Sequence, residues 1–235
     1  MTADNTIDGG AGTDTPSIAS AATAATVSGF ETLTATEATN RSQDMAVFLD
    51  NTTFTKVNSS LTADAYTLAL TNVRAGITTR AATTATATTL ARLIDTITNS
   101  LTVNVTGGQT ITGITASNEE TTNSASTNSS AVVVTALTAT DLSTLNITGS
   151  GAVTITTLGA NSTTAASTMT INASRNTGGV HLDASNGTIV GTITGSATVE
   201  NTQKETAGGD TIIGGTGADK IYVDNCGTKE VQPFS

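Results

Sequence analysis

The sequence of 235 residues predicts a mainly β fold, a β-solenoid of stacked short strands, on the strength of three observations. Thr makes up about a quarter of the chain, and Thr is a β-branched residue that favours pleated strands. Val, Ile and Leu alternate with Thr, Asn and Ser in short packets, which is the pattern of half-buried strands. Several packets recur about every 20 residues, and only 3% of residues are aromatic, which suits a narrow solenoid core filled by aliphatic side chains. A β-sandwich is the alternative architecture.

The first hundred residues are expected to hold irregular strands and one helix. Residues 1–17 form a Gly–Asp turn segment, and residues 18–100 form a mixed β segment with strand-like packets at 26–36 and 45–54. A stripe of aliphatic residues at helical spacing predicts one short helix near residues 88–101. The stripe consists of Leu90, Leu93, Ile94, Ile97 and Leu101.

Residues 101–201 carry the sustained alternation and are expected to form a Thr-rich β-solenoid-like region. Gly, Asn or Ser bounds each packet, as turn residues do. The packets are 101–106, 109–115, 131–138, 143–149, 152–159, 167–174, 179–185, 187–195 and 197–201. The Ser-, Thr- and Asn-rich stretch 115–130, which contains Glu119 and Glu120, is expected to be a solvated loop. Residues 202–225 are expected to form a C-terminal roll, and residues 226–235 a tail.

The composition excludes several classes of function. Acidic residues outnumber basic residues 19 to 9, and no basic residue lies between Leu93 and Ser174, so we expect no nucleic-acid partner. No apolar run approaches the length of a transmembrane segment. One His and one Cys leave no material for a Cys/His metal site or a common His-centred triad. We therefore expect no enzyme activity, a structural role for His181, and no assigned role for Cys226.

The opening residues have neither the basic start nor the apolar run of a secretory signal. An exported protein with this start would have lost its signal, would use another export route, or would be part of a longer chain.

Two Gly–Asp segments carry the most specific pattern in the chain. One is the run Gly9-Gly10-Ala11-Gly12-Thr13-Asp14. The other, residues 214–222, matches the nonapeptide G-G-x-G-x-D-x-U-x, in which U is aliphatic. Asp210 and Asp219 are nine residues apart, as are Ile212 and Ile221. This spacing is typical of calcium-binding β-rolls, although Gly/Asp turns without metal are the simpler alternative.

Calcium suits these segments chemically. Ca²⁺ takes six to eight hard oxygen ligands, and glycines allow tight turns that aim backbone carbonyls at one point. We therefore expect Ca²⁺ as the cofactor, with no other cofactor and no catalytic residue. The expected metal ligands are Asp8, Gly9, Ala11, Asp14, Asp210, Gly214, Thr216, Gly217, Asp219 and Asp224. The aliphatic Ile212 and Ile221 are expected to point into the coil.

With these motifs, and with connecting packets such as 27–33 and 142–151, the chain resembles the RTX (hemolysin-type) calcium-binding repeat proteins. As a whole it resembles the calcium-dependent bacterial surface-layer proteins that type I secretion exports. The repeat motif covers about a tenth of the chain. The chain departs from the pattern at Pro16, which takes an aliphatic position, and at Asn5, which stands where the preceding unit would place Asp.

The resemblance implies a secreted protein whose β-rolls bind calcium and whose subunits tile the bacterial cell surface. The expected function is that of a structural, self-assembling surface-layer (S-layer) subunit. Its expected partners are copies of itself in a lateral lattice and a cell-surface polysaccharide. The alternative is a stalk or binding module of a large secreted RTX adhesin. A secreted hydrolase would require a catalytic domain that the sequence does not indicate.

Overall fold

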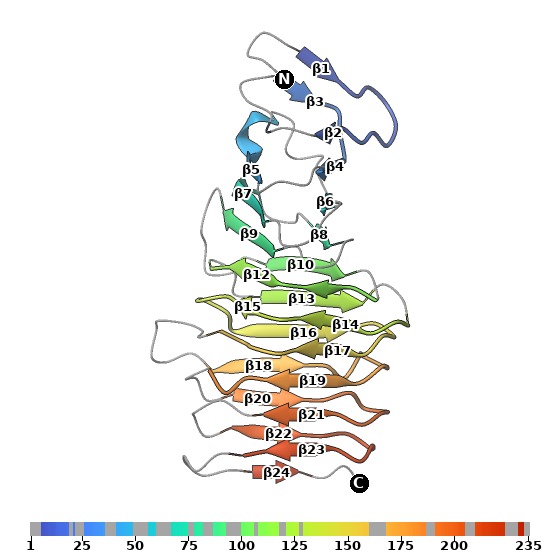
Figure 1. Ribbon diagram of the computed structural model, residues 1–235, viewed down its shortest axis with the longest axis vertical. Coiled ribbons are helices and arrows are strands. Elements are labelled where there is room, and N and C mark those ends of the chain that lie inside the picture. Colours follow the sequence, from blue (N-terminus) through green and yellow to red (C-terminus); the bar gives the residue numbers. More distant parts are fainter. Residues whose placement is uncertain are drawn as a thin grey trace.

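The chain forms a parallel β-solenoid in the computed structural model, which describes residues 6–18, 21, 26–35, 41–48, 56–59, 67–74, 78–81, 87–92, 100–105, 108–117, 121–126, 129–159, 168–186, 191–204, 210–223 and 230–232. The strand pairs in this part of the chain are parallel. The strands stack along the long axis of the molecule (Figure 1). The predicted β-solenoid is confirmed, and the sandwich is not observed.

One sheet of 11 strands runs along the whole described part of the chain. In order, its strands are β2 (Ser17–Ile18), β4 (Thr32–Ala35), β6 (Lys56–Ser59), β8 (Thr78–Ala81), β10 (Ser100–Val105), β13 (Thr121–Ser126), β16 (Thr144–Thr148), β18 (Met169–Asn172), β20 (Gly191–Thr194), β22 (Thr211–Ile213) and β24 (Glu230–Gln232). Its strands come from the mixed β segment, the Thr-rich region, the C-terminal roll and the tail.

Two shorter sheets supply the other walls of the coils. The six-stranded sheet contains β11 (Thr110–Ile111), β14 (Val132–Val134), β17 (Val153–Ile155), β19 (Val180–Asp183), β21 (Thr202–Lys204) and β23 (Lys220–Tyr222). The five-stranded sheet contains β15 (Leu137–Thr138), β12 (Gly113–Ala116), β9 (Ala87–Arg92), β7 (Thr67–Val73) and β5 (Arg41–Asp44). Near the first coil, β1 (Thr6–Asp8) pairs with β3 (Thr26–Ser28).

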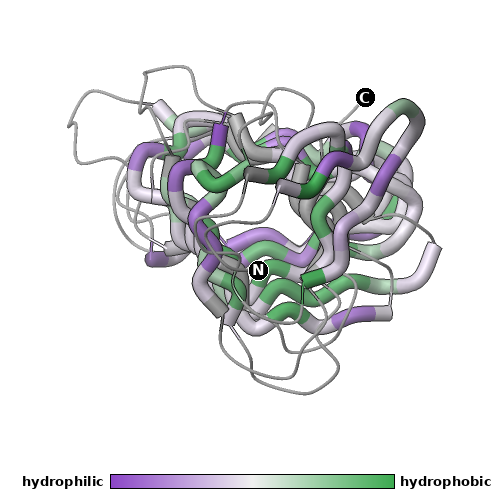
Figure 2. Tube along the Cα trace, turned by 90° about the horizontal axis from the view of Figure 1, so that it is seen from above, coloured by the Kyte–Doolittle hydropathy of each residue, from purple (hydrophilic) through white to green (hydrophobic). Residues whose placement is uncertain are grey.

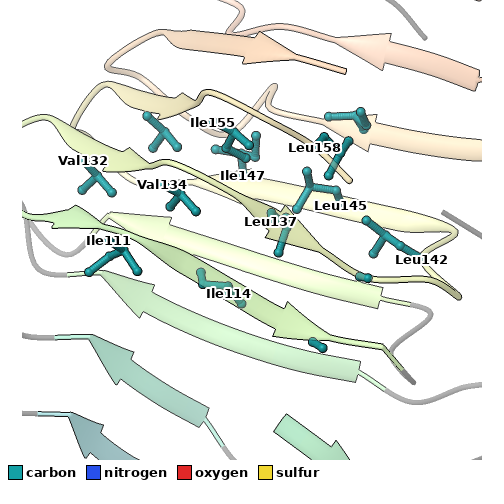
Figure 3. Packing of buried hydrophobic residues seen from close by; sticks show 14 of the residues in the cluster. Ile111, Ile114, Val132, Val134, Leu137, Leu142, Leu145, Ile147, Ile155 and Leu158 are labelled. Atoms are coloured by element: carbon teal, nitrogen blue, oxygen red, sulfur yellow. The ribbon is translucent and has the colours of Figure 1, made fainter. Parts of the chain in front are cut away.

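The alternating sequence produces this fold because successive strand residues point to opposite faces. In β16, Leu145 and Ile147 are buried, whereas Thr144, Asn146 and Thr148 lie on the outer face. Figure 3 shows aliphatic side chains from facing strands filling the space between the walls. Aliphatic residues thus form columns along the axis, and no aromatic anchor is needed in this region.

The coils after β18 differ little in length. Residues joined between neighbouring coils by hydrogen bonds are 19 positions apart for Gly191 and Asp210, 21 for Val180 and Asn201, and 18 for Asn201 and Asp219. Seen from above, the coils lie over one another around a common axis (Figure 2). The recurrence of about 20 residues in the sequence is therefore the length of one coil.

The prediction of a helix near residues 88–101 is wrong for the residues that the structure describes there. Residues 87–92 form strand β9, which lies between β7 and β12, and Ser100 begins strand β10. Parallel neighbours on both sides offer β9 a complete backbone ladder, and its Thr residues have low helix propensity. Leu93, Ile94 and Ile97 lie outside the described residues.

The loop predicted at 115–130 is also wrong in part, because residues 121–126 form strand β13. This strand pairs with β10 on one side and β16 on the other. Its sequence, TTNSAS, contains no large apolar residue. Ser124, in the middle of the strand, is buried. Pairing to two neighbours decides the conformation of such a polar segment, so periodicity could not find it.

Two other packets differ from expectation. The packet at 197–201 is an irregular segment, and strand β21 begins only at Thr202. In the packet at 45–54, Met45–Val47 form a short 3-10 helix, η1, after which Phe48 bridges Val27; residues 49–54 lie outside the description. The Oδ1 atom of Asp44 accepts a hydrogen bond from the Ala46 N–H and so caps η1. In the described residues η1 is the one helix, and it has three residues. No helix in this part of the chain is therefore long and apolar enough to span a membrane.

Candidate functional site

The N-terminal Gly–Asp turn follows strand β1 and folds back on the residues after β3. Asp8 Oδ1 accepts a hydrogen bond of 3.0 Å from the Gly10 N–H, and the Gly9 N–H donates to Ser28 O. Gly10 and Gly12 have φ angles of 82° and 138°, in the region that favours glycine. The predicted glycines are thus required by the turn itself, whether or not the turn holds a metal.

A close approach of Gly9 and Gly29 brings two of the predicted ligands together. A Cβ on Gly29 would lie 2.5 Å from Asp8 Oδ1, and a Cβ on Gly9 would lie 3.0 Å from Asp14 Cβ while clashing with Gly29 O. Asp8 Oδ1 and the Cβ atom of Asp14 therefore lie against the same pair of glycines. Ala11, the remaining predicted ligand in this turn, is exposed between Gly10 and Gly12.

Asp14 carries the least satisfied atom of this turn. Its N–H donates to Glu31 Oε2 at 2.8 Å, so a third carboxylate is also close. Its Oδ2 atom is buried and has no hydrogen-bond partner among the described residues. A buried carboxylate oxygen without a donor is costly, and a cation would remove that cost.

The C-terminal Asp210 and Asp219 occupy equivalent places on two different walls. Asp210 immediately precedes β22 in the 11-stranded sheet, and Asp219 immediately precedes β23 in the six-stranded sheet. Ile212 is buried, and Ile221 packs against the core, so both point inward as expected. The nine-residue spacing is therefore half a coil. The two aspartates therefore lie on different walls of the coil.

Asp210 binds the coil that precedes it. It is buried, and its Oδ1 atom accepts a hydrogen bond of 2.7 Å from the Gly191 N–H. A Cβ on Gly191 would lie 2.5 Å from Met169 O, so only glycine allows this approach of the chains. The Asp210 carboxylate therefore links two successive coils by a hydrogen bond.

Asp219 also binds the preceding coil, through Asn201. Asp219 Oδ1 accepts hydrogen bonds from the backbone N–H and from Nδ2 of Asn201, each at 2.8 Å. Gly214 O accepts a third hydrogen bond from the same Nδ2 atom at 3.0 Å. Two predicted calcium ligands, Gly214 and Asp219, thus share one amide group.

Four oxygen atoms surround Asn201 Nδ2 at 2.8–3.0 Å, although an amide nitrogen has only two hydrogens. They are Ser196 O, Val199 O, Gly214 O and Asp219 Oδ1. The orientation of the amide follows from its oxygen, which accepts hydrogen bonds from the N–H groups of Val180 and Ser196. Asn201 therefore places a donor nitrogen inside a cage of acceptor oxygens. Asn201 stands 18 residues before Asp219, which is the length of one coil, and this spacing could have indicated the contact from the sequence.

The remaining predicted C-terminal ligands also make contacts within the solenoid. Thr216 Oγ1 donates to Ala197 O at 2.8 Å, and Gly217 O accepts from the Asp219 N–H at 3.1 Å. Asp224 lies outside the described residues. Within the described ranges, no group of three His, Cys, Asp or Glu side chains is arranged to hold a metal ion.

A buried polar network continues from Asn201 into earlier coils. Ser196 Oγ donates to Asn176 O at 2.6 Å, and Asn176 Nδ2 donates to Gly151 O at 3.0 Å. All three polar residues, Asn176, Ser196 and Asn201, are at most 1% exposed. Because a buried amide must be satisfied, this network holds successive turns at one corner of the solenoid in register.

Charged pairs lie on the outer surface of the six-stranded sheet. Lys204 Nζ lies 3.4 Å from Asp183 Oδ2, and Lys220 pairs with Glu200. Partial burial raises the pKa of Asp183, but hydrogen bonds from Ser185 and the charge of Lys204 outweigh it and lower this pKa overall. The hydrogen bond and charge of Glu200 raise the pKa of Lys220.

Of the other residues considered in the sequence, His181 lies in the described part of the chain. His181 is an exposed residue of β19, opposite Thr154 and Thr202 on neighbouring strands. Glu119, Glu120 and Cys226 lie outside the described residues.

No family model matches the chain, and searches of curated proteins and of solved structures also give no match.

Proposed function

We propose that this protein is a structural subunit of a bacterial surface layer, secreted to the cell surface and stabilised there by calcium. The observation that carries the calcium proposal is the buried Oδ2 atom of Asp14, which has no hydrogen-bond partner among the described residues. Asp8 belongs to the same turn, and Glu31 Oε2 accepts a hydrogen bond from the Asp14 N–H. No basic residue lies in the sequence from Met1 to Asn40, so no nearby cation of the same segment neutralises this turn. Carboxylate and carbonyl oxygens are the ligands that Ca²⁺ prefers.

Asp8, Asp14 and the carbonyls of Gly9 and Ala11 would hold the ion in this turn. Calcium would neutralise the carboxylates of Asp8 and Asp14 and would couple the turn between β1 and β2 to the turn after β3. Because a metal that binds the folded state stabilises it, the first coils would become more protected as calcium rises.

The C-terminal turn is the second proposed calcium site, but there an ion must compete with a group already in place. Gly214 O and Asp219 Oδ1 both accept hydrogen bonds from Asn201. Calcium would have to displace this amide. We therefore propose weaker binding by Gly214, Thr216, Gly217 and Asp219 than by the N-terminal turn.

Self-assembly is supported by an edge of the solenoid. Among the described strands, β23 pairs with β21 and is the last strand of the six-stranded sheet, and the outer edge of such a strand can pair with another chain. Tyr222 and Val223, at this edge, are 56% and 52% exposed. We propose that this edge joins one copy to the next, with a cell-surface polysaccharide as a further partner of the assembled layer.

The calcium proposal is tested by calorimetric titration of the full chain with CaCl₂, together with hydrogen exchange in calcium and in EDTA. Asp14→Asn keeps the shape of the side chain and should lower calcium affinity and the calcium-dependent protection of residues 6–35. Asp141→Asn, in a turn of another coil, is the matched control. Equal affinities for the wild-type chain and Asp14→Asn would overturn the N-terminal site.

The assembly proposal is tested by electron microscopy of the protein with calcium and with EDTA. We expect ordered sheets or filaments with calcium, fewer of them with EDTA, and fewer again in Tyr222→Asp. Persistent monomers of the wild-type chain in calcium would contradict the surface-layer function even if calcium binds.

A further inference from the structure

A polar hollow of about 330 Å³ lies on the outer face of the 11-stranded sheet. It is lined by Asn146, Thr148, Asn172 and Arg175. The first two residues belong to β16, whose alternate residues Leu145 and Ile147 are buried, so this face of the strand points outward. Asn172 lies directly opposite Asn146 in the parallel register of β16 and β18. The hollow is therefore built by two adjacent coils and the turn that follows them.

The turn that carries Arg175 is held by buried contacts. The neighbouring Asn176 is fully buried, donates through Nδ2 to Gly151 O at 3.0 Å, and accepts from the Gly178 N–H at 3.0 Å. The Asn176 N–H also donates to Ala173 O at 2.8 Å and closes the turn. Arg175 is thus an exposed cation whose backbone is already anchored, so that binding has to order its side chain alone.

The amide of Asn172 is oriented as well. Its Oδ1 atom accepts hydrogen bonds from the N–H of Ser174 at 3.0 Å and from Ser174 Oγ at 2.7 Å. Since the oxygen is engaged, the NH₂ group of Asn172 is the part left to bind a ligand. Together with the Thr148 hydroxyl and the Arg175 guanidinium, it makes the lining rich in hydrogen-bond donors.

Charge narrows the class of ligand. None of the lining residues is acidic, and Arg175 is the only Lys or Arg between Leu93 and Gln203 in a chain of net charge −10. One guanidinium can pair with one carboxylate in a bidentate manner. Densely charged ligands such as nucleic acids need several cations, and this face does not have them.

The shape of the surrounding face favours an extended ligand. Outward-facing Thr residues of successive coils are in register beside the hollow: Thr144, Thr170, Thr192 and Thr211. Neighbouring strands lie about 4.7–4.9 Å apart, so hydroxyls repeat at this interval along the axis. The hollow is also within the size range of small-molecule sites, roughly 300–1,000 Å³, and larger than one inorganic ion needs.

We propose that this hollow binds one carboxylate-bearing sugar unit of an acidic polysaccharide, whose chain continues along the Thr column. Arg175 pairs with the carboxylate, while Thr148 and Asn172 bind sugar hydroxyls. This proposal goes beyond calcium binding and assembly, and each can fail without the other, because the hollow shares no residue with the Gly–Asp turns or with the edge at Tyr222.

The test is a calorimetric titration of the full chain with trimers of galacturonate, mannuronate and glucuronate, in EDTA and again in calcium. We expect at least one trimer to bind in both buffers, and its methyl ester to bind about tenfold more weakly, because esterification removes the charge. Arg175→Gln should cause a similar loss. Lys204→Gln, on the opposite sheet, is the matched control and should bind as the wild-type chain does.

Several outcomes would overturn the proposal. Binding of none of the three trimers would exclude the acidic sugar as ligand. Inorganic phosphate that displaces a bound trimer completely at equal concentration would indicate a general oxyanion site. Equal affinity of Arg175→Gln and the wild-type chain would place the ligand elsewhere. Thermal unfolding of each variant checks that Arg175→Gln remains folded, as expected for an exposed side chain.

Discussion

Asn201 and Asp219 are joined twice, because the backbone N–H and the side-chain Nδ2 of Asn201 both donate to Asp219 Oδ1 at 2.8 Å. The two residues occupy equivalent positions in successive coils, each directly before a strand of the six-stranded sheet. In the parallel register of β19 and β21, Val180 takes this place in the preceding coil, and its N–H donates to Asn201 Oδ1. An aliphatic column of the core, Val132, Val153 and Val180, therefore continues as a polar link between the last coils.

Asn201→Ala should be strongly destabilising. The substitution leaves the buried N–H groups of Val180 and Ser196 and the carbonyl of Gly214 without their partner, and we expect a loss of about 3 kcal/mol in the free energy of unfolding. Urea denaturation measures this loss. Asn186→Ala, at an exposed position in a turn, is the control and should change the stability by less than about 0.5 kcal/mol.

Asn201→Asp distinguishes an amide cage from a latent metal site. The variant places a second carboxylate beside Asp219, so at neutral pH we expect destabilisation by about 3 kcal/mol from like-charge repulsion and lost hydrogen bonds. Because the new group adds an oxygen ligand to the cage, millimolar calcium should restore much of the stability, whereas NaCl at equal ionic strength should not. Thermal unfolding in CaCl₂, NaCl and EDTA provides the comparison. Identical unfolding in all three would show that the cage cannot adapt to a cation.

Gln203→Met should stabilise the protein. Gln203 is 1% exposed, and its Oε1 atom has no hydrogen-bond partner among the described residues. It lies in register between Leu182 and Ile221, in an otherwise aliphatic column. Met has a similar shape without the unsatisfied oxygen, so we expect a gain of about 1–2 kcal/mol in urea denaturation. Gln203→Glu, which buries a charge in the same place, should do the opposite. A loss of stability in Gln203→Met would indicate that the oxygen has a partner in solution.

Gly178→Ala tests the close contact between coils. A Cβ on Gly178 would lie 2.6 Å from Gly151 O and still nearer to other backbone atoms, which cannot move as a side chain can. We expect a loss of about 2–3 kcal/mol. The matched control is Gly113→Ala, because the nearest atom to its new Cβ is Ala136 O at 3.8 Å. That variant should remain within about 1 kcal/mol of the wild-type chain. Similar losses in both variants would mean that strand propensity, not contact between coils, sets the cost.

Acid should weaken the link between Asp183 and Lys204. Ser185 and Lys204 hold the pKa of Asp183 below its ordinary value of 3.8 despite partial burial. The folded state therefore binds this proton less readily than the unfolded state, and the resulting stability is present above about pH 4 and lost as pH falls through the lowered pKa. Asp44, whose pKa the Asn72 amide and the Ala46 N–H lower, acts in the same direction.

Asp183→Asn should accordingly reduce the loss of stability between pH 5 and pH 2, by less than about 1 kcal/mol because the pair is partly exposed. Urea denaturation over this range measures the effect. Ser185→Ala removes the hydroxyl that donates a hydrogen bond to Asp183 and should produce part of the same change in stability. If the free energy of unfolding of Asp183→Asn falls between pH 5 and pH 2 as steeply as that of the wild-type chain, this carboxylate does not contribute to the acid dependence.

Local pattern was sufficient for most strands, because alternation places aliphatic residues on one face and one face of each strand is buried. The packets at 143–149 and 167–174 contain β16 and β18 for this reason. Pattern failed at β13, where pairing with β10 and β16 decides the conformation of a polar segment. It failed again at β9, where aliphatic spacing resembled a helix although parallel neighbours were available on both sides.

The sequence by itself determined the short strands, the aliphatic core and the Gly–Asp turns, because these depend on residues close together along the chain. The nine-residue register of Asp210 and Asp219 likewise placed them before strands on two different walls. Only the tertiary structure decided what those carboxylates bind: Asp210 the Gly191 N–H, and Asp219 the amide of Asn201. These partners are 19 and 18 residues away, and turns of varying length set which residues meet. Register between coils, rather than local chemistry, therefore determines the polar links of this solenoid.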